Sequence, residues 1–205
     1  MAEIEVLDLQ EGSGETGEIR NKCLVGKVLS QKSINPLAIS NILRGAWKTR
    51  AEFSVVPWND NTFLFKFEDE EDRDSILKAS PWSVMNNLLV LQLLSGDEAV
   101  TCIEFLSCPF WVQIHGLPVE KMSRSNAEII GRRFRKLLGV EAFSDGLLLS
   151  RSFLRLRVEI DLSQPLPKGF WLRKTKDNGK DLWISYKYEK LSDFCYAGGR
   201  IGHES

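Results

Sequence analysis

Three phenylalanines alternate with other residues between Thr62 and Phe67, and this alternation constrains the fold more than any other feature of the sequence. Successive side chains of a strand point to opposite faces of a sheet, so Phe63, Phe65 and Phe67 share one face. The other face carries a threonine, a leucine and a lysine. We therefore predict that the three phenylalanines are buried beneath helices that cover this sheet.

The segments around this strand have the order strand, helix, strand, strand, helix, strand. Asn35 and Pro36 are typical of a helix N-cap and first helical position, and an acidic first turn favours the second helix. The expected elements are strands over 23–29, 51–56, 61–67 and 88–94 and helices over 36–47 and 69–78. We predict an α+β protein in which residues 21–97 form a ferredoxin-like, RRM-like βαββαβ domain.

The sequence argues against the usual RNA-binding mode of this fold. An RRM stacks bases on exposed aromatic side chains of its third and first strands. The corresponding positions of the third strand fall on Thr62 and Leu64, and the first strand, residues 24–28, contains no aromatic residue. Because many unrelated proteins share the βαββαβ order, we expect the shape of an RRM without its base-stacking platform.

A second α+β region, rich in antiparallel strands, is expected over residues 102–190. Ser125 and Glu128 resemble a capping box, so we predict a basic helix from 125 to 138 that ends at Gly139. Asn178-Gly179 predicts the turn of a hairpin. The expected strands are 110–115, 152–162, 170–174 and 181–188. The second of these alternates charged and apolar residues, which predicts a half-buried strand with a charged outer face.

The charge of the chain is divided unevenly between its halves. Residues 1–100 carry 10 Lys and Arg against 16 Asp and Glu, whereas residues 101–205 carry 17 against 12. A polyanion should therefore prefer the second half, although ordinary solvated surface charge is the alternative. The candidate phosphate contacts are Arg132, Arg135, Lys136, Arg155, Arg157, Lys174 and Lys176.

The predicted hairpin combines aromatic and basic residues. Basic side chains beside exposed rings suit single-stranded nucleic acid, because the cations meet phosphates while the rings stack on bases. The alternative is an ordinary solvated hairpin with Trp171 and Trp183 in the core. The sequence alone leaves both interpretations open.

Cys195 and His203 stand eight positions apart, which is the spacing of a zinc knuckle. In the pattern C-x2-C-x4-H-x4-C, three thiolates and one imidazole surround Zn²⁺, and Gly202 fits the glycine that precedes the histidine. Position 198 is Gly198 instead of cysteine, and the fourth ligand would fall at position 208, beyond Ser205. We expect an incomplete metal site and no bound cofactor in the chain as written.

These residues resemble a known family, plant retrotransposon-associated proteins in which a domain of unknown function precedes a CCHC zinc knuckle. They are similar to the first open reading frame protein of LINE-type elements. The segments that carry the resemblance are 110–118, 155–161, 165–170 and 188–203. The resemblance implies a non-catalytic protein that binds RNA or single-stranded DNA. It also implies zinc in complete family members, and identifies residues 191–205 as a degenerate, truncated knuckle.

Several features that are absent from the sequence restrict the classes of protein to which the chain can belong. Residues 1–20 are acidic and poor in apolar residues, which predicts a disordered tail. No apolar run approaches the length of a membrane span, and four scattered cysteines favour an intracellular location, in the nucleus or cytoplasm. We find no catalytic motif and expect no enzyme. The alternative to nucleic-acid binding is a protein-interaction or structural module, or a decaying relic.

Overall fold

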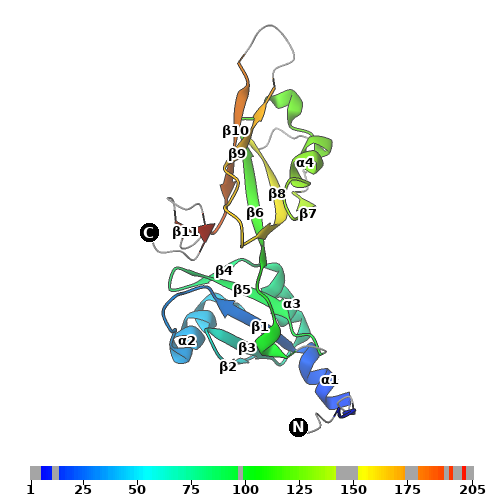
Figure 1. The fold of residues 1–205 in the computed structure, drawn as a ribbon, viewed down its shortest axis with the longest axis vertical. Coiled ribbons are helices and arrows are strands. Elements are labelled where there is room, and N and C mark those ends of the chain that lie inside the picture. The colour runs from blue at the N-terminus through cyan, green and yellow to red at the C-terminus, as the bar shows by residue number, and fades with distance from the viewer. Residues whose placement is uncertain are drawn as a thin grey trace, which may run out of the picture.

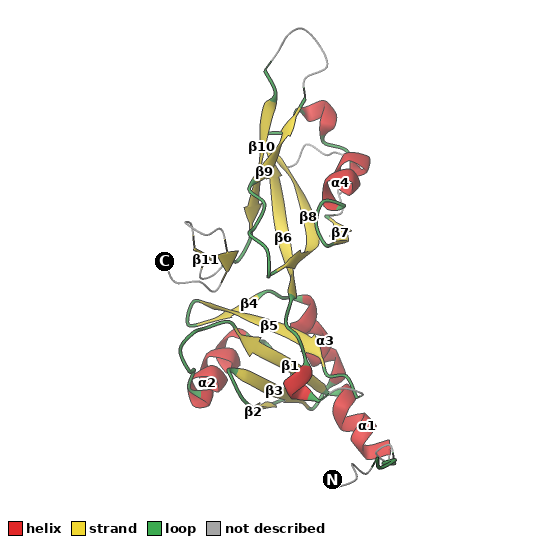
Figure 2. Ribbon diagram, viewed as in Figure 1, coloured by secondary structure: helices red, strands yellow, loops and turns green. Residues whose placement is uncertain are grey.

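The protein has a mixed α+β architecture with two antiparallel five-stranded sheets (Figures 1 and 2). We call the part around the first sheet, from β1 to β5, the first unit, and the part around the second sheet, from β6 to β10, the second unit. The computed structural model describes residues 6–10, 14–96, 99–141, 152–173, 180–191, 194–195 and 200–201. None of the helices in these ranges is long and apolar enough to span a bilayer.

The first unit has the predicted order of elements, with one strand added. Its elements are β1 (Cys23–Val28), α2 (Pro36–Ala46), β2 (Phe53–Pro57), β3 (Thr62–Phe67), α3 (Glu70–Lys78), β4 (Trp82–Val84) and β5 (Asn87–Leu93). The strands pair antiparallel in the order β2-β3-β1-β5-β4, and the sheet curls into a half-barrel. The sequence analysis does not predict β4, which is only three residues long.

Asn35 and Asp69 begin the two helices of this unit. The Asn35 side chain accepts a hydrogen bond from Leu37 N, and the Asp69 side chain accepts one from Glu71 N, both at 2.9 Å. Each cap satisfies a backbone N–H that the first helical turn leaves without a partner. The two predicted helices are therefore confirmed, and their boundaries are nearly correct.

The core of the first unit confirms the predicted burial of the phenylalanine face. Phe63, Phe65 and Phe67 are 2%, 0% and 1% exposed. The indole of Trp47, directly after α2, lies among them, with its centroid 5.1 Å from that of Phe65 and 5.8 Å from that of Phe67. This aromatic cluster packs with side chains of α2 and α3, including Ile39.

The opposite face of the first sheet is covered as well. Val25, Leu88 and Val90 point away from the helices, yet all three are 0% exposed. Leu88 and Val90 belong to the core of the second unit, and Gln92 Nε2 donates to Glu104 O at 2.9 Å in the link between the units. Figure 1 shows this link crossing in front of β1 on its way to β6. The face on which an RRM would stack bases is largely occupied by the protein itself.

The second unit repeats the strand order of the first. Its elements are β6 (Ser107–His115), α4 (Arg124–Gly131), β7 (Lys136–Val140), β8 (Phe153–Asp161), β9 (Gly169–Leu172) and β10 (Leu182–Tyr188). The antiparallel order β7-β8-β6-β10-β9 matches β2-β3-β1-β5-β4, strand for strand. Residues 162–168, between β8 and β9, contain no helix, so the second unit lacks a counterpart of α3 there. Leu166 of this connection is buried in the core instead.

Short elements lie outside the two sheets. They are α1 (Gly14–Asn21), the 3-10 helices η1 (Val100–Cys102) and η2 (Val119–Lys121), and the strand pair β11 (Phe194–Cys195) and β12 (Arg200–Ile201). The predicted disorder of residues 1–20 is wrong for α1, although that helix buries no side chain. Its weak apolar pattern explains why the sequence gives no sign of it. Residues 1–5 and 11–13 lie outside the described ranges.

The helix predicted over residues 125–138 begins close to the expected residue but ends much earlier, at Gly131. Helix α4 starts after Ser123, whose Oγ accepts a hydrogen bond from Asn126 N at 3.2 Å. It ends at Gly131, where an added Cβ would lie 2.6 Å from Leu137 Cδ1. The glycine therefore lets the chain turn back and Leu137 pack against it. The following residues pair with β8 as strand β7, so tertiary pairing overrides their helical pattern.

The aromatic core gives a direct test of this fold. Phe65→Ala should lower the free energy of unfolding by about 3 to 5 kcal/mol, because it removes a fully buried ring and leaves a cavity. Urea unfolding of the purified protein measures this change. Leu37→Ala is the control, since Leu37 is 74% exposed and its loss should cost no more than about 0.5 kcal/mol. Equal stability of the Phe65 variant and the unmodified protein would contradict the burial.

Candidate nucleic-acid interface

The face of the second sheet that points away from α4 carries polar and aromatic side chains at every second position. Buried and partly exposed residues alternate along the whole of β6 and β8, as the charge alternation of the sequence predicts for β8. The buried set, including Phe110 and Leu156, packs with α4. We call the other side the open face. Its residues include Trp111, Gln113, His115, Phe153, Arg155, Arg157, Glu159, Trp171, Trp183, Ser185 and Lys187.

Four rings on four neighbouring strands form what we call the aromatic row: Phe153 on β8, His115 on β6, Trp183 on β10 and Trp171 on β9. His115 and Phe153 are direct cross-strand partners with ring centroids 4.8 Å apart, and Trp171 and Trp183 are partners at 5.1 Å. Trp171 is 65% exposed and Trp183 is 42% exposed. The two tryptophans are therefore exposed, and the alternative that places them in the core is wrong. With strands about 4.8 Å apart, the row spans roughly 14 Å.

Gly169 shapes the aromatic row and is a residue that sequence reasoning missed. Its φ of +155° is a backbone conformation that other residues rarely adopt, and an added Cβ would lie 2.8 Å from Trp183 Cζ2 and closer still to Ile184 O. The Trp183 ring therefore lies close over Gly169. The sequence did carry a sign of this close approach, because a glycine stands at the start of a predicted strand, next to two aromatic residues.

Exposed cations lie near the row. Arg173 directly follows β9, Lys180 precedes β10, and Lys187 is on β10 two positions from Ser185. Burial of the imidazole, and to a lesser extent the charge of Lys187, lowers the pKa of His115 below its ordinary value. His115 is therefore a neutral ring near pH 7, and Lys187 is close enough to influence it. Rings beside cations are the features that single-strand binding requires.

Arg155, a predicted phosphate contact, is already held by two carboxylates. Its Nε and Nη2 donate to both Glu189 oxygens at 2.8 and 2.7 Å, and its Nη1 donates to Glu141 at 3.0 Å. The guanidinium also lies 4.0 Å from the ring centroid of Trp111. Two carboxylates thus take up the hydrogen-bond donors of this guanidinium, which leaves it poorly placed to bind a phosphate. Its role is to organise the open face.

Arg157, another predicted phosphate contact, joins the two units. Its Nη2 donates to Lys78 O at 2.9 Å, and Lys190 Nζ donates to Ala79 O at 3.3 Å. These two carbonyls end helix α3, where the helix dipole favours cations and the last carbonyls lack helical partners. Lys190 also lies 5.1 Å from the ring centroid of Trp82. This end of the open face is therefore engaged with the first unit.

The remaining basic candidates do not form the predicted helical cluster. Arg132 is the C-cap of α4 and Lys136 begins β7, so Arg132, Arg135 and Lys136 do not project from one helix. All three are exposed. Lys136 is the cross-strand partner of Glu159 and lies on the open face. Lys174 and Lys176 lie outside the described residues.

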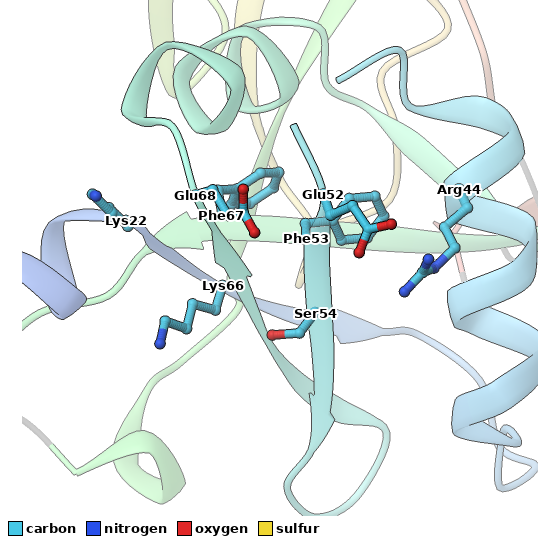
Figure 3. Close-up of a pocket in the computed structure, with 8 residues that line it drawn as sticks. All are labelled: Lys22, Arg44, Glu52, Phe53, Ser54, Lys66, Phe67 and Glu68. Carbon is cyan, nitrogen blue, oxygen red and sulfur yellow. The ribbon is translucent and has the colours of Figure 1, made fainter. Parts of the chain in front are cut away.

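The first unit has a cavity of about 430 Å³ at the end of β2 and β3, but its chemistry is less suited to a polyanion (Figure 3). Arg44 of α2 lies on one side and Lys22 and Lys66 on the other. Its lining residues are Lys22, Arg44, Glu52, Phe53, Ser54, Lys66, Phe67 and Glu68. The carboxylates offset most of the positive charge, and the two phenylalanine rings are buried and stacked on each other, with centroids 5.6 Å apart.

The described residues provide no set of metal ligands. Nowhere in the described ranges do three His, Cys, Asp or Glu side chains gather in a way that could hold a metal. On β6, Cys108 faces the core and His115 the open face, and burial raises the pKa of Cys108 to about 12, so it remains a thiol. The side chain of Cys195 and all of His203 lie outside the described part. Because Gly198 offers no donor atom, the residues present do not complete a zinc knuckle.

Removing the Arg157 side chain tests the contact between the units. Arg157→Met should lower the free energy of unfolding by about 1.5 to 3 kcal/mol, because the α3 carbonyl then loses a charge-assisted hydrogen bond. Urea unfolding followed by tryptophan fluorescence measures the loss. Arg132→Met, at an exposed position, is the matched control and should change little. A neutral effect at both positions would show that this hydrogen bond does not stabilise the protein.

Restoring one ligand position tests the zinc assignment. The unmodified chain should retain well under one equivalent of zinc after dialysis against a mild chelator, because two protein ligands hold the ion weakly. Gly198→Cys should raise the zinc affinity, whereas Gly199→Cys should not, because only position 198 matches the pattern. Metal analysis and zinc titration measure both. One firmly held equivalent in the unmodified chain would overturn the prediction.

Comparison with known proteins finds one family match over the first unit and another that begins within β8 and runs to the end of the given sequence. Residues 18–101 match the DUF4283 family, a domain of unknown function, and residues 160–205 match a zinc knuckle family. The chain is 27% identical over 129 residues to the uncharacterized protein At4g02000 of Arabidopsis thaliana. This similarity covers 63% of the chain and 40% of the relative's length. The chain is thus similar to a DUF4283 domain in its first part and to a zinc knuckle in its last part.

Proposed function

We propose that this protein binds single-stranded nucleic acid, RNA or DNA, through the aromatic row of its second unit. The observation that carries the proposal is the set of four rings on one sheet face, with Trp171 and Trp183 exposed to solvent. Large exposed rings that belong to no core are available to stack on unpaired bases. The zinc knuckle match supports the same class of function, since such domains suggest nucleic-acid binding.

The exposed rings of the aromatic row favour binding of an unpaired strand over binding of a duplex. The flat faces of bases are available for stacking on side chains only where the strand is unpaired. Exposed Arg173, Lys180 and Lys187 can then meet phosphates on either side of the rings. Arg155 and Arg157, in contrast, are bound within the protein, so we do not assign them to phosphates.

The first unit has a supporting role in this proposal. The open side of its sheet is largely covered by the link and by the second unit, and α3 supplies the carbonyls that Arg157 and Lys190 bind. We therefore propose that it fixes the position of the second sheet. We also propose that the protein is non-catalytic, acts inside the cell and derives from a retrotransposon, on the strength of its resemblance to such proteins.

The two exposed tryptophans give the sharpest test. Trp171→Ala and Trp183→Ala should each weaken binding to a fluorescein-labelled single-stranded oligonucleotide by about 5- to 150-fold, because stacking on one ring contributes about 1 to 3 kcal/mol per base. Fluorescence anisotropy measures the affinity. Trp58→Ala is the control, since this tryptophan is 52% exposed on the first unit and should not affect binding.

Salt dependence separates this function from that of a protein-interaction module. The logarithm of the association constant should fall by about 0.7 per neutralised phosphate for each unit of log salt concentration. The Trp variants should keep this slope, because they remove stacking and no cation. Absence of oligonucleotide binding at low salt would refute the proposed function and favour the interaction module.

A further inference from the structure

A chain of hydrogen bonds on the open face begins at Arg155 and ends at the aromatic row. The Glu189 carboxylate receives two hydrogen bonds from the Arg155 guanidinium. Glu189 Oε1 also accepts from Gln113 Nε2 at 2.8 Å. Because an ionised carboxylate only accepts hydrogen bonds, the Gln113 atom that faces it must be the amide nitrogen.

This orientation of Gln113 determines the state of His115. The Gln113 amide oxygen then faces His115 Nε2, at 2.9 Å. An amide oxygen only accepts, so Nε2 must carry the ring proton. The lowered pKa of His115 keeps the ring neutral near pH 7, which leaves Nδ1 as a hydrogen-bond acceptor. Within the described part of the chain, no hydrogen bond reaches Nδ1.

Two residues with hydrogen-bond donors lie on the neighbouring strand, on the same face as His115. Ser185 is the direct cross-strand partner of His115, and Lys187 is the partner of Gln113. Neither the Ser185 hydroxyl nor the Lys187 ammonium has a hydrogen-bond partner among the residues that the structure describes. The face thus offers one acceptor and two donors next to a row of rings. Uracil and thymine carry the complementary set, a ring N–H between two carbonyl oxygens.

We propose that His115, with Ser185 and Lys187, recognises the ring N–H and carbonyl edge of an unpaired uracil or thymine whose ring is stacked on a tryptophan of the aromatic row. Adenine and cytosine have no ring N–H in their neutral forms, so they cannot donate to Nδ1 in this way. This inference rests on the proposed function and adds base selectivity to it. Arg155, Glu189 and Gln113 are positioning residues, because they act through His115.

A modified oligonucleotide tests the hydrogen bond to Nδ1 directly. The unmodified protein should bind oligo(dT) about 3- to 10-fold more tightly than the same oligomer with N3-methylthymine, which keeps its stacking ring but lacks the N–H. His115→Phe preserves a stacking ring and removes the acceptor. It should bind both oligomers with equal affinity. Oligo(dC) should behave like the methylated oligomer with both proteins.

The outcomes separate this inference from the function on which it rests. If the unmodified protein binds both oligomers equally, base recognition through His115 is wrong while single-strand binding stands. If neither oligomer binds, the proposed function fails and this inference fails with it. If His115→Phe still prefers the unmethylated oligomer, the selectivity comes from another residue and the assignment to His115 is wrong.

The tautomer itself provides a test that does not depend on any variant folding. Two-bond ¹H–¹⁵N spectra distinguish the two neutral forms of histidine, and the chain has only one other histidine, His203. His115 should be protonated at Nε2 in the unmodified protein. Gln113→Leu should shift it toward a mixture and reduce the discrimination against N3-methylthymine. Protonation at Nδ1 in the unmodified protein would overturn the inference.

Discussion

Strand β5 belongs to two hydrophobic cores at once, and the arrangement of the protein depends on this double burial. Leu89 and Leu91 pack beneath the helices of the first unit, whereas Leu88 and Val90 pack into the core of the second. A strand buried on both faces has no polar side to offer to solvent. It therefore ties the two sheets together through apolar contact, and the cations at the end of α3 add hydrogen bonds at the same junction.

This double burial decides which sheet can present a binding face. In the first unit, the face free of helices is taken up by the link and by the second unit. The second unit keeps part of its equivalent face, at the end of the sheet away from the junction (Figure 1). There the charged residues divide into two kinds. Arg155 and Arg157 hold the face together, and the cations around the aromatic row remain exposed.

The sequence predicted the first unit far better than the open face. Alternation at Phe63 to Phe67 and the caps at Asn35 and Asp69 are local signals, and each gave the correct element. The region after Gly131 could not be predicted, because its pairing with β8 outweighs a helical pattern. Charge alone suggested Arg155 as a phosphate contact, but its partners Glu141 and Glu189 come from elsewhere in the chain. Such long-range pairing has no local signature, and neither does the repeated strand order.

The missing counterpart of α3 has a consequence for dynamics. In the described part of the chain, one helix covers the second sheet where two cover the first, and a short connection with Leu166 takes the place of the other. Backbone amides in less protected regions exchange with solvent through local opening at lower free energy than those in a well-covered core. The second unit should therefore open more readily than the first. A ligand that binds only the closed form of the second unit would make that opening rarer. The protection of its backbone amides from hydrogen exchange would therefore show how much of the protein has ligand bound.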